Sequence, residues 1–197
     1  MAGIVLAAGR SRRMGENKLL VRLGGETVLR RAVRTARAAG LDPICVVVGE
    51  EPERLLGELA GLPVVPVVNP EPERGMSRSL REGVAALPDD VAGVAVLLAD
   101  MPFVAATMVR AVVEAATEAA WDAPMAAASY EGVVAPPYFY RRALFPELLE
   151  LDGDGCGKRI YKRHQGEAAV VSLPATALAD LDVPADLERA RELLGGP

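Results

Sequence analysis

Short, continuous runs of apolar residues recur through the first half of the chain and constrain its fold more than any other feature. They cover residues 3–8, 44–48, 64–68 and 93–99, and segments with helical spacing of alanine, leucine and arginine separate them. Strands of a parallel sheet read as unbroken apolar runs because helices cover both of their faces. The pattern therefore predicts an α/β fold in which strands and helices alternate around an open sheet.

Glycine and proline residues mark where the other elements begin and end. Gly40 followed by Asp42-Pro43 ends the first helix, and the proline-rich stretch 69–75 is a loop that opens into a later helix. The helices predicted in this way cover residues 26–40, 52–60, 76–87, 106–120, 141–149, 158–164 and 184–194, and the later strands cover residues 123–129, 133–139, 167–173 and 177–181. The 197 residues contain no repeat or linker, so we expect a single domain over residues 1–197.

Composition excludes several classes of function. The formal net charge is −5 and the charges are mixed along the chain, so there is no basic stripe to follow a nucleic-acid backbone. Cys45 and Cys156 are too few for a disulfide framework or a zinc site, and we expect both to be reduced thiols. The first residues do not resemble a signal peptide, and no apolar stretch approaches the ~20 residues of a membrane span. We therefore expect a cytoplasmic protein that binds neither nucleic acid nor membrane.

The loop after the first apolar run carries the strongest chemical signal. It reads LAAGRSRRMGENK from Leu6 to Lys18 and combines small residues with cationic ones. At the carboxyl end of a central strand, small residues let backbone N–H groups approach a phosphate, while arginine and lysine neutralise its charge. A triphosphate fits this loop, although a strand-to-helix loop with merely solvated arginines would have the same composition.

This segment resembles the signature LAAGxSxRMGxxK of the nucleotidyltransferases that modify the molybdenum cofactor, and it meets every fixed position. Residues 75–80 resemble the family's second substrate loop, residues 97–104 its metal-binding strand end, and residues 180–187 its closing DxDTPEDL segment. The resemblance implies the nucleotide-diphospho-sugar transferase fold, which is similar to that of A-type glycosyltransferases: a Rossmann-like open, mixed, mostly parallel sheet flanked by helices. It also implies nucleotide binding by Leu6, Ala7, Ala8, Gly9, Arg10, Ser11, Arg13, Lys18, Gly75, Met76 and Ser79.

Asp100 is the first candidate metal ligand. It follows the apolar run 93–99, so its carboxylate should emerge at the same edge of the sheet as the loop at Gly9. Mg²⁺ takes oxygen ligands and usually only one or two protein carboxylates, although an aspartate at a strand end is often just a cap or turn former. The resemblance favours the metal role and offers Asp182, or Asp180 on the same strand face, as the second ligand. Simple solvent exposure of this second pair is the alternative.

The glycine-rich run 152–159, DGDGCGKR, invites two other interpretations that fail. It is not a P-loop, because Arg159 replaces the required serine or threonine and a helix precedes it, and it lacks the later ligands of an EF-hand. In the cytidylyltransferase relatives a GDxGAR-like loop lies here and is thought to face the pterin acceptor. The resemblance therefore implies acceptor binding by Asp154, Gly155, Gly157 and Lys158, while the departures at residues 156–158 leave the identity of the acceptor open.

Together these features predict an Mg²⁺-dependent nucleotidyltransferase with Arg13, Lys18 and Asp100 as its catalytic residues. The two cations would neutralise the phosphates, and Asp100 would hold the metal. The family's guanylyltransferases tend to carry LAGG where this chain has LAAG, so we expect transfer of CMP from CTP to the terminal phosphate of molybdopterin cofactor, with a molybdoenzyme as a further partner. Two alternatives stay open: an enzyme that uses GTP or another NTP with a different phosphorylated acceptor, such as a sugar or polyol phosphate, and a non-catalytic carrier of molybdenum cofactor. The enzymatic interpretations require the loop of Lys18 and the carboxylate of Asp100 to converge on one pocket.

Overall fold

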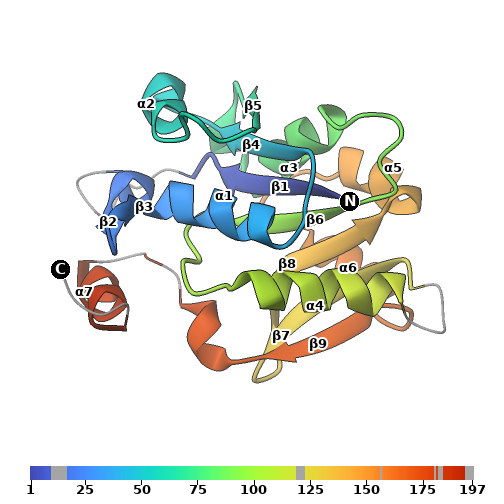
Figure 1. The fold of residues 1–197 in the computed structure, drawn as a ribbon. Helices are drawn as coiled ribbons and strands as arrows, with labels where there is room; N and C mark the ends of the chain where they lie inside the picture. Colours follow the sequence, from blue (N-terminus) through green and yellow to red (C-terminus); the bar gives the residue numbers. More distant parts are fainter. Residues whose placement is uncertain (10–16, 119–122, 156, 180, 182–183, 194–197) are drawn as a thin grey trace.

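A computed structural model describes residues 1–9, 17–118, 123–155, 157–179, 181 and 184–193. Its main feature is a seven-stranded sheet with the strand order β5-β4-β1-β6-β8-β7-β9 (Figure 1). The strands are β1 (Ala2–Ala7), β4 (Ile44–Val48), β5 (Val65–Val68), β6 (Gly93–Leu98), β7 (Met125–Tyr130), β8 (Val133–Arg141) and β9 (Ala169–Leu173). The four apolar runs of the first half form β1, β4, β5 and β6, which are parallel to one another, whereas β8 runs antiparallel to both β6 and β7. The predicted mixed, mostly parallel sheet is confirmed.

Helices cover both faces of the sheet, as the unbroken apolar strands require (Figure 1). On one face lie α1 (Val28–Ala38) and α4 (Ala106–Thr117), which share a core with side chains such as Val5 and Val46. On the other face lie α3 (Met76–Ala85), α5 (Phe145–Leu149) and α6 (Lys158–His164), which pack with Ile4 and Val47. Consecutive side chains of β1 and β4 thus pack into the cores on opposite faces of the sheet, because side chains alternate between the two faces of a strand. The other two α-helices are α2 (Pro52–Gly57) and α7 (Pro184–Leu193).

The sequence of α1 illustrates how these helices are specified. Its buried residues are Val28, Leu29, Ala32, Val33 and Ala36, a spacing that places them along one face of an α-helix. The side chain of Thr27 accepts a hydrogen bond from the Arg30 backbone N–H at 3.3 Å and so caps the first turn. Within the described ranges, no helix is both long and apolar enough to cross a lipid bilayer.

Two predicted elements are wrong. The first helix does not begin at Glu26, because β2 (Arg22–Leu23) and β3 (Glu26–Thr27) form a small hairpin whose turn uses positive φ at Gly24 and Gly25. The strand predicted over residues 177–181 is replaced by η4 (Ala175–Leu178), a 3-10 helix that follows Pro174 and buries Ala177. Asp180 and Asp182 therefore cannot be assigned to one face of a strand, and both lie outside the described residues.

Candidate nucleotide site

The carboxyl ends of β1 and β6 meet at one edge of the sheet. The two strands are parallel neighbours in register, with Leu6 beside Leu98, and the Ala99 backbone N–H donates to the Leu6 carbonyl at 3.0 Å. Gly9 leaves β1 and Asp100 leaves β6 at this edge. The edge is where α/β sheets place their ligands, since the loops that leave parallel strands open there.

Lys18 and Asp100 form a close ion pair at this edge. The Lys18 Nζ lies 2.6 Å from the Asp100 Oδ2, and the side chains are only 11% and 25% exposed. Lys18 begins η1 (Lys18–Leu20), a 3-10 helix whose preceding residue, Asn17, accepts a hydrogen bond from the Leu19 backbone N–H at 3.1 Å. This turn holds the lysine stem against the protein and directs the ammonium group to the carboxylate. The predicted convergence of the two groups is present in the structure.

A pocket of about 240 Å³ surrounds this pair. Its walls come from the end of β1, the turn at Lys18, the loop and helix start around Gly75, the end of β6 and the glycine-rich loop after α5. The lining residues are Leu6, Ala7, Ala8, Gly9, Lys18, Leu19, Pro72, Gly75, Met76, Ser79, Leu98, Asp100 and Asp154. Apolar walls with few convergent polar groups are typical of small-ligand sites.

The loop of Asp154 packs tightly against the start of α3. The Ser77 backbone N–H donates to the Gly153 carbonyl at 3.2 Å, and a Cβ placed on Gly75 would lie 2.6 Å from the Asp154 Oδ1. Gly75 also has φ +91°, a conformation that favours glycine. Only glycine at position 75 therefore lets the predicted acceptor loop approach the predicted nucleotide loop this closely.

All the predicted nucleotide residues that the structure describes line this pocket, but the predicted acceptor residues are divided. Asp154 lines it, whereas Gly155, Gly157 and Lys158 do not. Gly157 has φ +70° and packs against the Tyr140 hydroxyl, which gives it a role in the fold. The predicted site residues Arg10, Ser11, Arg13 and Asp182 lie outside the described residues.

Three further residues line the pocket and were not predicted from the sequence: Leu19, Pro72 and Leu98. Leu98 occupies the last position of an apolar strand, and Leu19 follows the predicted lysine. Position relative to the strand ends would have identified these two, whereas Pro72 reaches the pocket only through the path of its loop.

The donor set of the pocket fits one hard divalent cation. Asp100 and Asp154 are the two carboxylates that line it, and no cluster of three or more His, Cys, Asp or Glu occurs among the described residues. Mg²⁺ needs no such cluster, because water and substrate phosphates usually complete its shell of oxygen ligands. Asp100 is the carboxylate placed at the strand end, where the triphosphate is expected.

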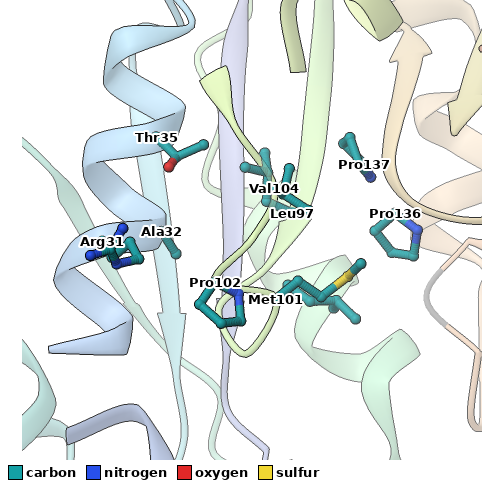
Figure 2. Close-up of a pocket in the computed structure, with 10 residues that line it drawn as sticks. Arg31, Ala32, Thr35, Leu97, Met101, Pro102, Val104, Pro136 and Pro137 are labelled. Atoms are coloured by element: carbon teal, nitrogen blue, oxygen red, sulfur yellow. The ribbon is translucent and has the colours of Figure 1, made fainter. Parts of the chain in front are cut away.

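A second cavity lies behind the turn that carries Asp100 (Figure 2). It is lined by Met101 and Pro102 from the turn, by Arg31 and Ala32 from α1, and by the two prolines in the middle of β8. Its volume of about 10 Å³ is that of a single water molecule, so it is too small for a nucleotide. The side chains in Figure 2 therefore serve to pack the Asp100 turn against α1 rather than to hold a substrate.

Comparisons with known proteins point to one family. Residues 3–169 match the family model of the MobA-like NTP transferase domain. The chain is 32% identical over 206 residues to the purine catabolism protein PucB of Bacillus subtilis, and the alignment covers 98% of this chain and 97% of PucB. It is also 32% identical over 183 residues to a probable molybdenum cofactor guanylyltransferase of Synechococcus elongatus, with 92% of this chain and 90% of that protein covered.

Solved structures show the same architecture. The crystal structure of Rv0371c from Mycobacterium tuberculosis superposes with a TM-score of 0.85 at 27% identity, and the match covers 97% of both chains. A structure of Rv0371c in complex with manganese superposes with a TM-score of 0.79 at 26% identity, again over 97% of both chains.

Proposed function

Because the chain belongs to the family of MobA-like NTP transferase domains, we propose that it transfers CMP from CTP to the terminal phosphate of molybdopterin cofactor and releases pyrophosphate. Nucleotidyl transfer is the chemistry of the family. The observation that carries the proposal for this chain is the ion pair between Lys18 and Asp100 at 2.6 Å, because it puts a cation and a potential metal ligand into one pocket.

The preference for CTP rests on Ala8. This residue lines the pocket and is 8% exposed, and its methyl group occupies a position where guanylyltransferase relatives tend to carry glycine. Ala8 also lies beside Gly49, where an added Cβ would come within 3.3 Å of the Ala8 Cβ, so a larger residue at position 49 would crowd the alanine. A narrower floor favours a pyrimidine over a purine. The name of the Synechococcus relative makes GTP the competing donor.

In the proposed reaction an oxygen of the acceptor phosphate attacks the α-phosphorus of CTP in line with the departing oxygen. The bond from the α-phosphorus to the oxygen that bridges it to the β-phosphate breaks, and that oxygen leaves with pyrophosphate. The protein does little covalent chemistry in such a step and acts by positioning and by charge stabilisation. Lys18, together with Arg13, would neutralise the phosphates, and Asp100 would hold Mg²⁺. When bound, the metal ion supplies further positive charge to the phosphate oxygens.

A second candidate is transfer of a nucleotide to a different phosphorylated acceptor. The observation that favours it is the division of the predicted acceptor loop, in which Asp154 lines the pocket but Gly155, Gly157 and Lys158 do not. The relative PucB carries a name from purine catabolism over almost the full length of both chains. Fold alone does not choose between the two acceptors.

Pyrophosphate release tests the proposal. The purified protein is incubated with CTP or GTP and Mg²⁺, with and without molybdopterin cofactor, and the nucleotide on the cofactor is identified by mass spectrometry. We expect release that depends on CTP, Mg²⁺ and the cofactor. Release that is faster with GTP would overturn the choice of donor, and release with only other phosphorylated acceptors would favour the second candidate. Tight binding of the cofactor without any release would indicate a carrier.

A further inference from the structure

A buried side-chain hydrogen bond adjoins the pocket on the side away from Lys18. The Asn69 Nδ2 lies 2.9 Å from the Ser79 Oγ, and the two residues are 1% and 4% exposed. Asn69 directly follows β5, and Ser79 belongs to α3 and lines the pocket. Asn69 does not line the pocket itself. Any effect of the asparagine on a ligand therefore passes through the groups that it touches, which are the Ser79 hydroxyl and the loop at Glu71 that leads to Pro72.

The surroundings of Asn69 determine which way its amide points. The Glu71 backbone N–H lies 2.9 Å from the Asn69 Oδ1, and a backbone N–H can pair only with an acceptor. The atom that faces Glu71 is therefore the amide oxygen, and the atom that faces Ser79 is the NH₂ group. The backbone N–H of Asn69 is bonded to the Val48 carbonyl at 2.8 Å, which anchors the residue at the end of the sheet.

This orientation determines what the serine hydroxyl can do. A hydroxyl has one proton to donate and two lone pairs to accept with, and one lone pair of Ser79 is engaged by Asn69. The hydrogen bonds within the described part of the chain use the Ser79 Oγ only as an acceptor. Its own proton thus remains to be donated, and the pocket that Ser79 lines is where a ligand acceptor can receive it.

Asn69, and with it the Ser79 hydroxyl that it contacts, lies away from the place expected for the triphosphate. Asp100 follows β6, whereas Asn69 follows β5, and the strand order places β1 and β4 between these two strands. Three strand spacings of about 4.8 Å put the two strand ends roughly 14 Å apart along the sheet edge. A triphosphate held at Lys18 and Asp100 leaves the nucleoside, rather than a phosphate, to reach toward Ser79.

We propose that Asn69 is a positioning residue that fixes the Ser79 hydroxyl as a hydrogen-bond donor to an acceptor atom of the nucleobase, a ring nitrogen or carbonyl oxygen. The inference rests on the proposed function, because it assumes that a nucleotide occupies this pocket. It adds the polarity of the contact: Ser79 donates to the base and Asn69 enforces that direction.

The test measures binding by calorimetry in the presence of Mg²⁺, with CTP, GTP and base-free tripolyphosphate as probes. The variants are Ser79→Ala, Asn69→Asp and the double variant, with Ser172→Ala on the exposed face of β9 as the matched control. Asn69→Asp keeps the acceptor for Glu71 but replaces the NH₂ group by an oxygen, so the Ser79 proton turns away from the pocket. Asn69→Ala takes its place if the buried carboxylate prevents folding.

We expect Ser79→Ala to weaken binding of the preferred nucleotide about threefold to tenfold, and Asn69→Asp to weaken it about tenfold. Tripolyphosphate binding should stay unchanged in both variants. In the Ser79→Ala background the substitution at Asn69 should add less than about twofold, because both changes remove the same contact. In turnover assays the KM for the nucleotide should rise while kcat is kept.

The inference would be overturned by an equal loss of tripolyphosphate binding, or by a loss of nucleotide binding on substitution of Asn69 that is the same with and without the Ser79 hydroxyl. Nucleotide affinity that is unchanged by both substitutions would also refute the inference, and it would leave the proposed function intact. If the wild-type protein binds neither CTP nor GTP, the proposed function and this inference fail together.

Discussion

Replacing Lys18 by alanine removes the cation that the proposed mechanism needs most. The Lys18 Nζ lies 2.6 Å from the Asp100 carboxylate, and the lysine side chain is 11% exposed. Loss of one preorganised donor to the reacting phosphates typically costs about 2.7–4 kcal/mol of transition-state stabilisation. We therefore expect the rate of pyrophosphate release to fall by about a hundredfold or more.

The same substitution also has a cost in stability that can be separated from its effect on the rate. A hydrogen bond to a charged group contributes about 1.5–3 kcal/mol, and the lower end applies here because water can reach the Asp100 carboxylate, which is 25% exposed. For a domain of this size that loss lowers the Tm by about 3–6 °C. The variant should thus remain folded in an assay at 25 °C.

The assay compares kcat and Tm for Lys18→Ala, for Lys18→Met, which keeps the apolar stem, and for Arg37→Ala, which removes one charge from the exposed face of α1. Both Lys18 variants should lose turnover and stay folded, and Arg37→Ala should match the wild type. Turnover within about fivefold of the wild type in Lys18→Met would refute the role assigned to the ammonium group. A variant that is unfolded at the assay temperature would mean that Lys18 acts on the fold.

Three further predictions concern the described residues around and beyond the pocket. Gly75→Ala should lower the free energy of unfolding by about 1–3 kcal/mol, because the added Cβ would meet Asp154 and the φ of +91° is unfavourable for alanine. Urea denaturation measures this change, and an unchanged urea midpoint would contradict the prediction. Burial raises the pKa of Glu147, but hydrogen bonds from His164 and a neighbouring arginine outweigh burial, so the pKa of this carboxyl group is lowered. The ionised carboxylate therefore stabilises the fold at pH values above its ordinary pKa of about 4.3, and this stabilisation is lost as the pH falls through the lowered pKa. The free energy of unfolding of Glu147→Gln, measured by urea denaturation, should therefore be lower than that of the wild type at pH 6 by less than about 1 kcal/mol. The difference should shrink below pH 4, and a constant difference would argue against the ion pair. Burial raises the pKa of the Cys45 thiol, and the side chain is 0% exposed. Peptide mapping should therefore find Cys45 unlabelled by iodoacetamide at pH 7.5 in the folded protein and labelled in urea. Rapid labelling of the native state would disprove the burial of Cys45.

The half of the site built from parallel strands was accessible to sequence reasoning. Buried parallel strands are continuous apolar runs, and their carboxyl ends must share one edge, so the meeting of Lys18 with Asp100 follows from the order of the runs at 3–8 and 93–99. The start of α3 at Met76 was predicted as well, because the proline-rich stretch before it cannot continue a helix.

Other parts depend on contacts between segments that are distant in the chain. Glu26 and Thr27 are compatible with a helix start, and only their pairing with β2 makes them a strand. The contact between Asn69 and Ser79 bridges a loop whose path no spacing rule predicts. The 3-10 helix Ala175–Leu178 is another such case, because its alternating residues read as a strand until Ala177 is buried against the core. Local patterns specify elements, whereas packing decides marginal ones.

The contributions to the pocket are unevenly distributed along the chain. Among the described residues that line it, all lie within the first hundred positions except Asp154, which belongs to the glycine-rich loop beyond β8. Under the proposed function, the residues that would bind the triphosphate and the loop that would face the acceptor are therefore encoded in separate stretches. Substitutions in the later stretch would then change which molecule receives the nucleotide without disturbing the residues that would hold its phosphates. Descendants of one ancestral transferase could diverge in this way into unrelated metabolic routes while keeping the same opening segment.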